Sequence, residues 1–444
     1  MHDCQAPPNG GATLACPSVA NIFRAFGDEC ARSYPLTADQ RRVLRHIQMC
    51  HSPALGGYVD VCDSCGFERI AFHGCRDRHC PGCQALDQAR WIQERKDRLL
   101  PLGHFHVIFT LPEQLRPLAL LNPKLIYDLL FDCGSQCLLQ LGRDPKWLGG
   151  RIGITAVLHT WTRKMLPHPH LHCIVTSGGL SADGSRWVDL PAPTFLFDVH
   201  AAGKLFRGKF MDALDQAWRR HLLHLAGPCA ELVGAQAWAT FKSVLYDMQW
   251  VVWAEAPESE DPHLVQYLGR YTHRVAISDQ RLISFDGRRV TFLVRKGEQC
   301  TLDGVDFVHR FLLHVLPPGF TKIRHFGLYA SANVNGALAS ARTLLEARRP
   351  HPELPIVGAE SITPVDSNLQ LSAPPLDLHE HAPPAVLSNS VNDTEPESCQ
   401  SEIQRLIGID PTACPRCHQR SVRRQPLPAP RSRAPPEPLS VSYS

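Results

Sequence analysis

The chain has 444 residues, of which 44% are hydrophobic and 20% charged, and its formal net charge is +3. This length allows two or three domains, and no run approaches the roughly 18 consecutive apolar residues of a membrane span. The first thirty residues lack the basic start and apolar block of a secretory signal, so we expect a cytoplasmic protein with no membrane partner. The small net charge neither requires nor excludes a nucleic-acid partner.

The first hundred residues are predicted to form a lead-in and a small metal-binding domain. Residues 1–34 carry Pro, Gly and Cys without periodicity and are expected to be flexible. Thr37-Ala-Asp-Gln40 is a capping-box pattern that begins a helix. A cysteine-rich stretch follows at 50–83, and a second helix is predicted over 84–100. The predicted domain therefore covers residues 35–100.

From residue 101 to 345 the pattern predicts one larger α+β domain. Strand-like runs alternate with helical stretches, and this mixture favours an antiparallel sheet. The predicted strands cover 104–111, 152–161, 170–176 and 248–254, and the predicted helices cover 123–141 and 208–226. Asp261-Pro262 then begins a helix through Arg274. A hairpin with the turn dipeptide Asp286-Gly287 follows at 281–295.

Residues 346–444 are rich in Pro and Ser and have few large apolar side chains, so a mostly disordered tail is predicted. Between Arg416 and Arg433 it carries arginines and no acid. This basic stretch is either a nucleic-acid-binding arm or a solvated tail.

The seventeen cysteines indicate structural zinc. Cys62-Asp-Ser-Cys65 and Cys80-Pro-Gly-Cys83 are two knuckles that together offer four thiolates, the ligand set of a closed tetrahedral zinc site. Their polar neighbours argue against a cysteine-rich core. A second site is an open alternative, and its candidate ligands are Cys50, His51, Cys75 and His79. Cys414-Pro-Arg-Cys417 is a lone knuckle with no partner pair beyond it, and we interpret it as the remnant of a zinc ribbon.

A second metal pattern lies in the predicted strand that contains His168-Pro-His170-Leu-His172. Alternate side chains of a strand share a face, so His170 and His172 point the same way and provide half of a metal site. His159, on the preceding strand, is the expected third ligand, while His168 and His106 compete for that place. Two ordinary surface histidines are the competing interpretation.

Tyr267-Leu-Gly-Arg-Tyr271 places two phenols on one face of the capped helix. An amphipathic helix that buries two aromatic rings would show the same spacing. Together with the histidines, however, the pair fits a defined chemistry. A phenolate attacks a DNA phosphorus atom, a histidine-bound divalent ion stabilises the developing charge, and a 3′ hydroxyl leaves. The product is a 5′-phosphotyrosine link.

In this combination and order, the motifs resemble those of the two-tyrosine HUH transposases of bacterial rolling-circle insertion sequences. The resemblance covers roughly residues 36–330. It rests on the knuckles with Cys75-Arg-Asp-Arg-His-Cys-Pro-Gly-Cys83, on His170-Leu-His172, and on the tyrosine pair followed by Thr-His-Arg274. It also includes the late segment 316–327, Leu-Pro-Pro-Gly-Phe-Thr-Lys-Ile-Arg-His-Phe-Gly.

The resemblance implies an antiparallel-sheet HUH endonuclease-like domain preceded by a zinc-binding domain that recognises an end of the element. Tyr267 and Tyr271 would be the nucleophiles, and His170 and His172 would bind Mg²⁺ or Mn²⁺. The implied DNA contacts are Arg270, Arg274, Arg324 and His325.

The implied partners are single-stranded element ends and target DNA, met at the bacterial nucleoid. No phosphate-binding GxxxxGK[ST] loop occurs, so a host helicase and the replication machinery are expected to unwind the DNA. Two rival functions remain at this point: a non-catalytic zinc-dependent nucleic-acid-binding protein, and a metal-dependent hydrolase that activates water.

Overall fold

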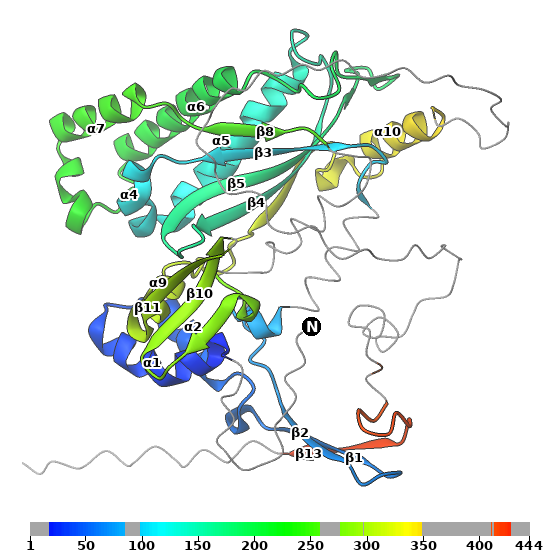
Figure 1. Ribbon diagram of the computed structural model, residues 1–444. Coiled ribbons are helices and arrows are strands. Elements are labelled where there is room, and N and C mark those ends of the chain that lie inside the picture. The colour runs from blue at the N-terminus through cyan, green and yellow to red at the C-terminus, as the bar shows by residue number, and fades with distance from the viewer. Residues whose placement is uncertain are drawn as a thin grey trace, which may run out of the picture.

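The computed structural model describes residues 17–84, 98–257, 276–295, 297–348, 410 and 413–427 (Figure 1). Its helices are α1 (Val19–Ser33), α2 (Ala38–Met49), α4 (Arg116–Leu121), α5 (Pro123–Arg143), α6 (Val199–Arg219), α7 (Ala235–Asp247), α9 (Gly304–Leu312) and α10 (Ala337–Glu346). Its strands are β1 (Gly57–Cys62), β2 (Glu68–Phe72), β3 (His104–Thr110), β4 (Gly153–Trp161), β5 (Pro167–Thr176), β6 (Gly179–Leu180), β7 (Trp187–Val188), β8 (Val252–Glu255), β9 (Leu282–Phe285), β10 (Arg289–Arg295), β11 (Glu298–Asp303), β12 (Ile323–Gly327) and β13 (Val422–Leu427).

The largest sheet has five strands in the order β12-β4-β5-β3-β8, and every neighbouring pair is antiparallel. Its residues alternate between two faces, as strand geometry requires. Phe109, Leu158 and Leu171 belong to the face that packs on α5 and α6, where the main apolar core lies. The opposite face carries the histidines of β3, β4 and β5. The predicted α+β class with an antiparallel sheet is confirmed.

A second unit joins the N-terminal helices to residues from far along the chain. Helices α1 and α2 pack with α9 and the three-stranded sheet β11-β10-β9, which contains the predicted hairpin. The predicted capping box is present, because Thr37 Oγ1 accepts from the Gln40 amide and Gln40 Oε1 accepts from the Thr37 amide. Figure 1 shows this unit beside the five-stranded sheet.

The prediction of a flexible lead-in over residues 1–34 is wrong for the described residues 17–34. Ser18 caps α1, and Val19, Ile22 and Phe23 are fully buried. The prediction overlooked the helical spacing of these apolar residues, and the surfaces that cover them belong to α2 and α9. The sequence alone did not indicate that α9, almost 300 residues later, would cover the apolar side of α1.

A third, smaller sheet corrects the prediction for the tail. Strand β13 pairs with β1 from Gly57↔Leu427 to Cys62↔Val422, and β1 also pairs with β2. Residues 413–427 are therefore an ordered part of the fold rather than disordered tail. Arginines of the basic stretch form ion pairs here, including Arg423 with Asp63 and Arg424 with Asp60.

Two predicted helices fall on undescribed residues. Most of the helix predicted over 84–100 lies in 85–97, and the helix from Asp261 to Arg274 lies in 258–275, both outside the described residues. Among the helices that the structure describes, none combines the length and apolar character needed to span a membrane.

We predict that Phe23→Ala lowers the free energy of unfolding of the α1–α2–α9 unit by about 3–5 kcal/mol, because it leaves a cavity in a closed core. Phe23 is fully buried and meets Phe311 edge to face at 5.1 Å. Urea-dependent hydrogen exchange in α1 and α9 would measure the change. Leu222→Ala, at a side chain 59% exposed, is the control. Equal small effects would contradict a core role for α1.

Candidate functional site

Three histidines converge on the sheet face opposite α5 and α6. His159 on β4 is paired in register with His170 on β5, and His172 follows on the same face of β5. One ring nitrogen from each of the three lies within 4.8 Å of the others. We call these residues the histidine cluster. The structure thus brings together the two predicted ligands and the expected third one.

Hydrogen bonds orient two of these rings. His170 Nδ1 donates to the His168 carbonyl oxygen at 2.7 Å, and His172 Nδ1 lies 2.8 Å from His106 Nε2. Both contacts use the Nδ1 side of the ring and leave Nε2 for another ligand. His172 Nε2 is buried without a hydrogen-bond partner among the described residues. His168 and His106, which competed as third ligands, therefore hold the rings of the cluster in place.

Burial keeps the cluster uncharged. It lowers the pKa of His170 to about 3, and it holds the pKa values of His159 and His172 well below their ordinary value. The neighbouring histidines lower these pKa values further because a second positive charge would be repelled. Neutral imidazole is the form that binds a metal ion. The cluster therefore presents three competent ligands at neutral pH.

Charged groups flank the cluster on two sides. Glu255 Oε2 lies 3.8 Å from His106 Nδ1, so a carboxylate and an imidazole stand in line behind His172. On the other side, Lys322 Nζ lies 4.8 Å from the centre of the Trp161 ring, which stacks on His159. Burial, followed by the nearby charge of Arg78, lowers the pKa of Lys322 to about 7.

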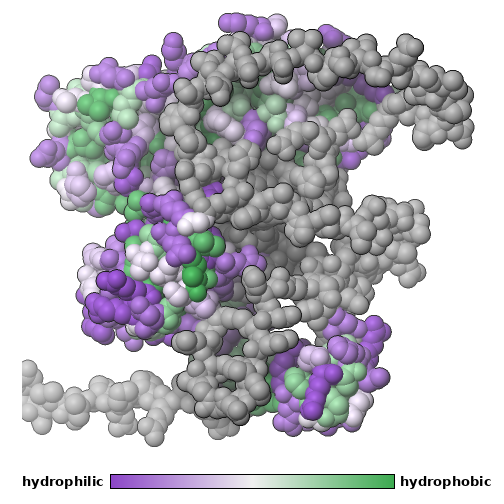
Figure 2. Space-filling model, in the orientation of Figure 1, coloured by the Kyte–Doolittle hydropathy of each residue, from purple (hydrophilic) through white to green (hydrophobic). Residues whose placement is uncertain are grey.

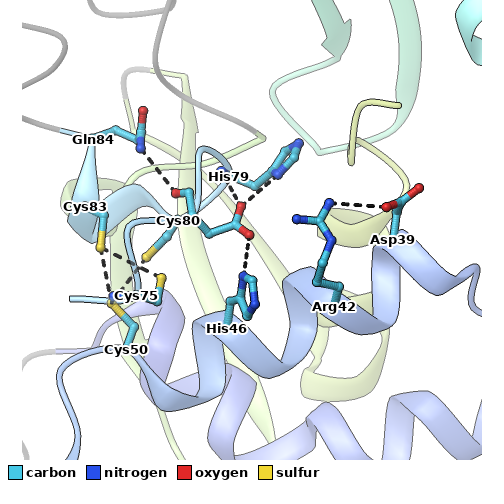
Figure 3. Close-up of polar contacts among 10 residues, drawn as sticks. Asp39, Arg42, His46, Cys50, Cys75, His79, Cys80, Cys83 and Gln84 are labelled. Atoms are coloured by element: carbon cyan, nitrogen blue, oxygen red, sulfur yellow. Dashed lines mark hydrogen bonds and ion pairs between the residues drawn. The ribbon is translucent and has the colours of Figure 1, made fainter. Parts of the chain in front are cut away.

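Cysteine cluster 1 consists of Cys50, Cys75, Cys80 and Cys83 (Figure 3). Cys50 Sγ lies 3.5 Å from the sulfurs of Cys80 and Cys83, and Cys75 Sγ lies 3.8 Å from that of Cys83. Zn–S bonds of about 2.3 Å in a tetrahedron require sulfurs about 3.8 Å apart. The separations therefore fit a zinc ion and are too long for disulfides.

The predicted zinc set of Cys62, Cys65, Cys80 and Cys83 is wrong, because the structure separates its two knuckles. Cys62 and Cys65 instead join Cys414 and Cys417, and these four form cysteine cluster 2. The reason is geometric. The first knuckle lies at the β1–β2 turn, in the small sheet with β13, whereas the second contacts the end of α2.

Two of the four candidate ligands of the predicted second site, Cys50 and Cys75, belong to cysteine cluster 1. Cys50 and Cys75 do pair with the Cys80–Cys83 knuckle, but His51 and His79 are outside that ligand group. The two ring nitrogens of His79 are both engaged, since Nδ1 lies 2.9 Å from Asp77 Oδ1 and Nε2 accepts from the Leu316 amide at 3.1 Å. His51 Nδ1 lies 3.1 Å from the Phe72 carbonyl oxygen.

The loop between Cys75 and Cys80 also contacts the late segment 316–327. Besides the bond between His79 and Leu316, Arg78 Nη2 donates to the Phe320 carbonyl oxygen at 2.8 Å. The late segment continues into β12, which pairs with β4 and so lies next to the strand of His159. Two motifs far apart in the sequence thus link the zinc-binding region to the histidine face.

The structure places the predicted DNA contacts of β12 on opposite faces. Arg324 is ion-paired with Asp128 of α5, and its guanidinium lies 4.3 Å from the centre of the Phe131 ring. His325 is on the histidine face, with Nδ1 3.0 Å from Thr155 Oγ1. The contacts of Arg324 with Asp128 and Phe131 thus explain its position without a DNA partner. The predicted nucleophiles Tyr267 and Tyr271, with Arg270 and Arg274, lie outside the described residues.

Comparison with known proteins identifies the family. Residues 22–111 match the model described as "Transposase zinc-binding domain", and residues 153–336 match "Putative transposase". "Putative transposase y4qJ" of Sinorhizobium fredii is 41% identical over 343 residues, which cover 76% of this chain and 86% of that protein. The chain belongs to the IS91 family of insertion-sequence transposases.

Two further proteins are similar to this transposase. The "Transposase for insertion sequence element IS801" of Pseudomonas savastanoi pv. phaseolicola is 29% identical over 296 residues, 65% of this chain and 69% of that one. A solved conjugative relaxase, TrwC with oriT DNA, matches at 13% identity with a TM-score of 0.23, over 38% of this chain and 72% of the relaxase.

The matched regions of the transposase contain cysteine cluster 1 and the histidine cluster in full. The zinc-binding domain is thus a shared property of the family. Cysteine cluster 2 is different, because Cys62 and Cys65 lie inside the matched zinc-binding domain whereas Cys414 and Cys417 lie outside both matched regions.

We predict that the transposase loses stability between about pH 6.5 and pH 4, because unfolding lets its buried histidines take up protons. Burial lowers the pKa of His104 to about 4, and its Nε2 lies 2.6 Å from the Tyr329 hydroxyl. The unfolded chain therefore binds this proton first as the pH falls. His104→Gln should reduce the loss by about 2–3 kcal/mol in denaturation compared at pH 7 and pH 4.5. His200→Gln, at an exposed position, is the control, and equal pH dependence of the two variants would contradict the prediction.

Proposed function

We propose that this transposase moves DNA by a rolling-circle mechanism in which Tyr267 or Tyr271 attacks single-stranded DNA. The observation that carries the proposal is the convergence of three neutral histidines on one buried sheet face, in a chain of the insertion-sequence transposase family. A phosphoryl group needs such a charge-stabilising centre beside a nucleophile. In the sequence, the tyrosine motif lies between β8, which belongs to the five-stranded sheet, and β9, which belongs to the neighbouring unit of α1, α2 and α9.

The proposed reaction exchanges one phosphodiester for another. The phenol loses its proton, its oxygen bonds to phosphorus, and the bond from phosphorus to the 3′ oxygen breaks. The 3′ oxygen leaves as a hydroxyl group after taking a proton, and the 5′ end stays on the tyrosine. A 3′ hydroxyl of another strand then reverses these steps in strand transfer. Two tyrosines allow donor cleavage and strand transfer to use separate nucleophiles, without ATP.

His159, His170 and His172 would hold the divalent ion, which we propose to be Mg²⁺ or Mn²⁺. When bound, the ion polarises the phosphoryl oxygen and offsets the charge that develops on it. Three protein ligands leave coordination positions for water and a phosphate oxygen. Imidazole nitrogen suits Mn²⁺ better than Mg²⁺, so Mn²⁺ is expected to bind more tightly. His106, which lies beside Glu255, would hold His172 in the orientation needed to bind the ion.

Single-stranded element ends and target DNA are the proposed substrates. The zinc-binding domain would recognise an end of the element, and a host helicase would unwind the duplex. Arg270, Arg274 and His325 remain proposed DNA contacts. For Arg324 the pairing with Asp128 favours a structural role, because a DNA phosphate would have to replace that carboxylate.

We predict that the double variant Tyr267→Phe, Tyr271→Phe forms no covalent DNA adduct, because phenylalanine has no nucleophilic oxygen. Purified protein would be incubated with labelled single-stranded DNA from its own element's end, with Mn²⁺ or Mg²⁺, and resolved on a denaturing gel. Tyr246→Phe, which removes an exposed hydroxyl, is the matched control and should form normal adducts. Cleavage without adducts in the wild type would instead favour a hydrolase, and binding without cleavage a non-catalytic protein.

We predict that His170→Ala or His172→Ala reduces metal-dependent cleavage by about 100-fold or more, because each removes a ligand that the remaining residues cannot replace. Binding of single-stranded DNA should survive in both variants. Cleavage rates and binding by fluorescence anisotropy would be measured together. His200→Ala, at an exposed position of α6, should keep both properties. Unchanged cleavage in the cluster variants would remove the histidines from the mechanism.

A further inference from the structure

We propose that cysteine cluster 2 binds a second zinc ion, which fastens the C-terminal segment 413–427 to the zinc-binding domain. Cys62 Sγ lies 3.6 Å from Cys417 Sγ, and Cys65 Sγ lies 3.7 Å from Cys414 Sγ. One sulfur from each of the four lies within 4.8 Å of the others, and all four thiols are free. These separations approach the edge of about 3.8 Å expected for a zinc tetrathiolate.

The two halves of the cluster have the same backbone form. In the first knuckle, the Cys62 amide donates to the Phe67 carbonyl, and the Gly66 amide donates back to the Cys62 carbonyl, both at 2.9 Å. In the second, the Cys414 amide donates to the Gln419 carbonyl and the His418 amide to the Cys414 carbonyl, again at 2.9 Å.

The residue after each knuckle is also in the same conformation. Gly66 has φ +68°, and His418 has φ +59° although it is not a glycine. A left-handed conformation costs a non-glycine residue free energy, so its persistence at His418 needs a compensating interaction. Two equivalent knuckles facing each other are what a closed tetrahedral zinc site requires.

The small sheet of β1, β2 and β13 buries little apolar surface of its own. No valine, leucine or isoleucine of β1, β2 or β13 is fully buried, and Ile70 is 61% exposed. Figure 2 shows hydrophobic residues at the surface of this region beside hydrophilic ones. A three-stranded sheet without an apolar core is marginal in water, and small modules of this kind commonly depend on a metal ion.

Polar contacts would add to the stabilisation that the metal ion gives, and most of them form only when 413–427 is docked on β1. Buried Asp60 accepts from Arg424 at 2.7 Å and from Arg69 at 2.8 Å, and the Arg424 guanidinium lies 3.7 Å from the centre of the Tyr58 ring. The Asp63 amide donates to the Ser421 carbonyl at 3.0 Å. The ion would thus join residues about 350 positions apart in the sequence.

Zinc content tests the proposal. Full-length protein purified without chelators should contain about two zinc ions per chain, one for each four-cysteine set. The double variant Cys414→Ser, Cys417→Ser should contain about one, because cysteine cluster 1 remains intact. Cys300→Ser, at a half-buried thiol outside both clusters, is the matched control and should keep two. One zinc ion in the wild type, or unchanged zinc in the double variant, would overturn the proposal.

Proteolysis separates loss of this site from general unfolding. Loss of the second zinc ion alone should expose 413–427 to cleavage, while the cleavage pattern of the five-stranded sheet stays as in the wild type. In addition, Arg424→Gln should retain two zinc ions but release one of them to a chelator faster, since it weakens docking without removing a ligand. Equal release rates from wild type and Arg424→Gln, together with unchanged proteolysis in the double cysteine variant, would count against a zinc-dependent attachment.

Discussion

The alternation of side chains across the five-stranded sheet is the constraint on which this structure depends. One face must be apolar to pack on α5 and α6, and the other is then free to carry polar groups. Leu171 and His172 are adjacent in sequence, yet one is in the main core and the other in the histidine cluster. A shift of one residue in register would exchange these faces and destroy core and cluster together.

Contacts from Arg78 and His79, next to cysteine cluster 1, connect the zinc-binding region to the five-stranded sheet through the late segment 316–327. Both residues lie between Cys75 and Cys80. They form hydrogen bonds with the backbone of Leu316 and Phe320. The same late segment supplies β12 at one edge of the sheet. Zinc at cysteine cluster 1 would therefore stabilise the histidine face as well as its own domain. In this transposase the metal-binding region and the proposed catalytic face are structurally continuous.

The three ligand groups differ in how the fold supports them. The histidines are held by a rigid sheet with a large core, so they exist as a site before any ion binds. Cysteine cluster 1 is attached to the core of α1, α2 and α9 through Cys50 and Cys80. Cysteine cluster 2 has almost no apolar core around it, so its zinc ion would contribute a larger share of local stability.

The sequence by itself determined the local features: the capping box at Thr37, four of the five strands of the main sheet, the hairpin at Asp286-Gly287, and the shared face of His170 and His172. These depend on periods of two or 3.6 residues and on turn chemistry, which neighbouring residues encode. Only the tertiary structure decided that α1 belongs to a core and which cysteines share a site. Cys62 and Cys417 are 355 residues apart, and local spacing carries no information on which knuckle meets which. Chain folding brings such ligands together, because metal coordination depends on distance in space and not on distance along the sequence.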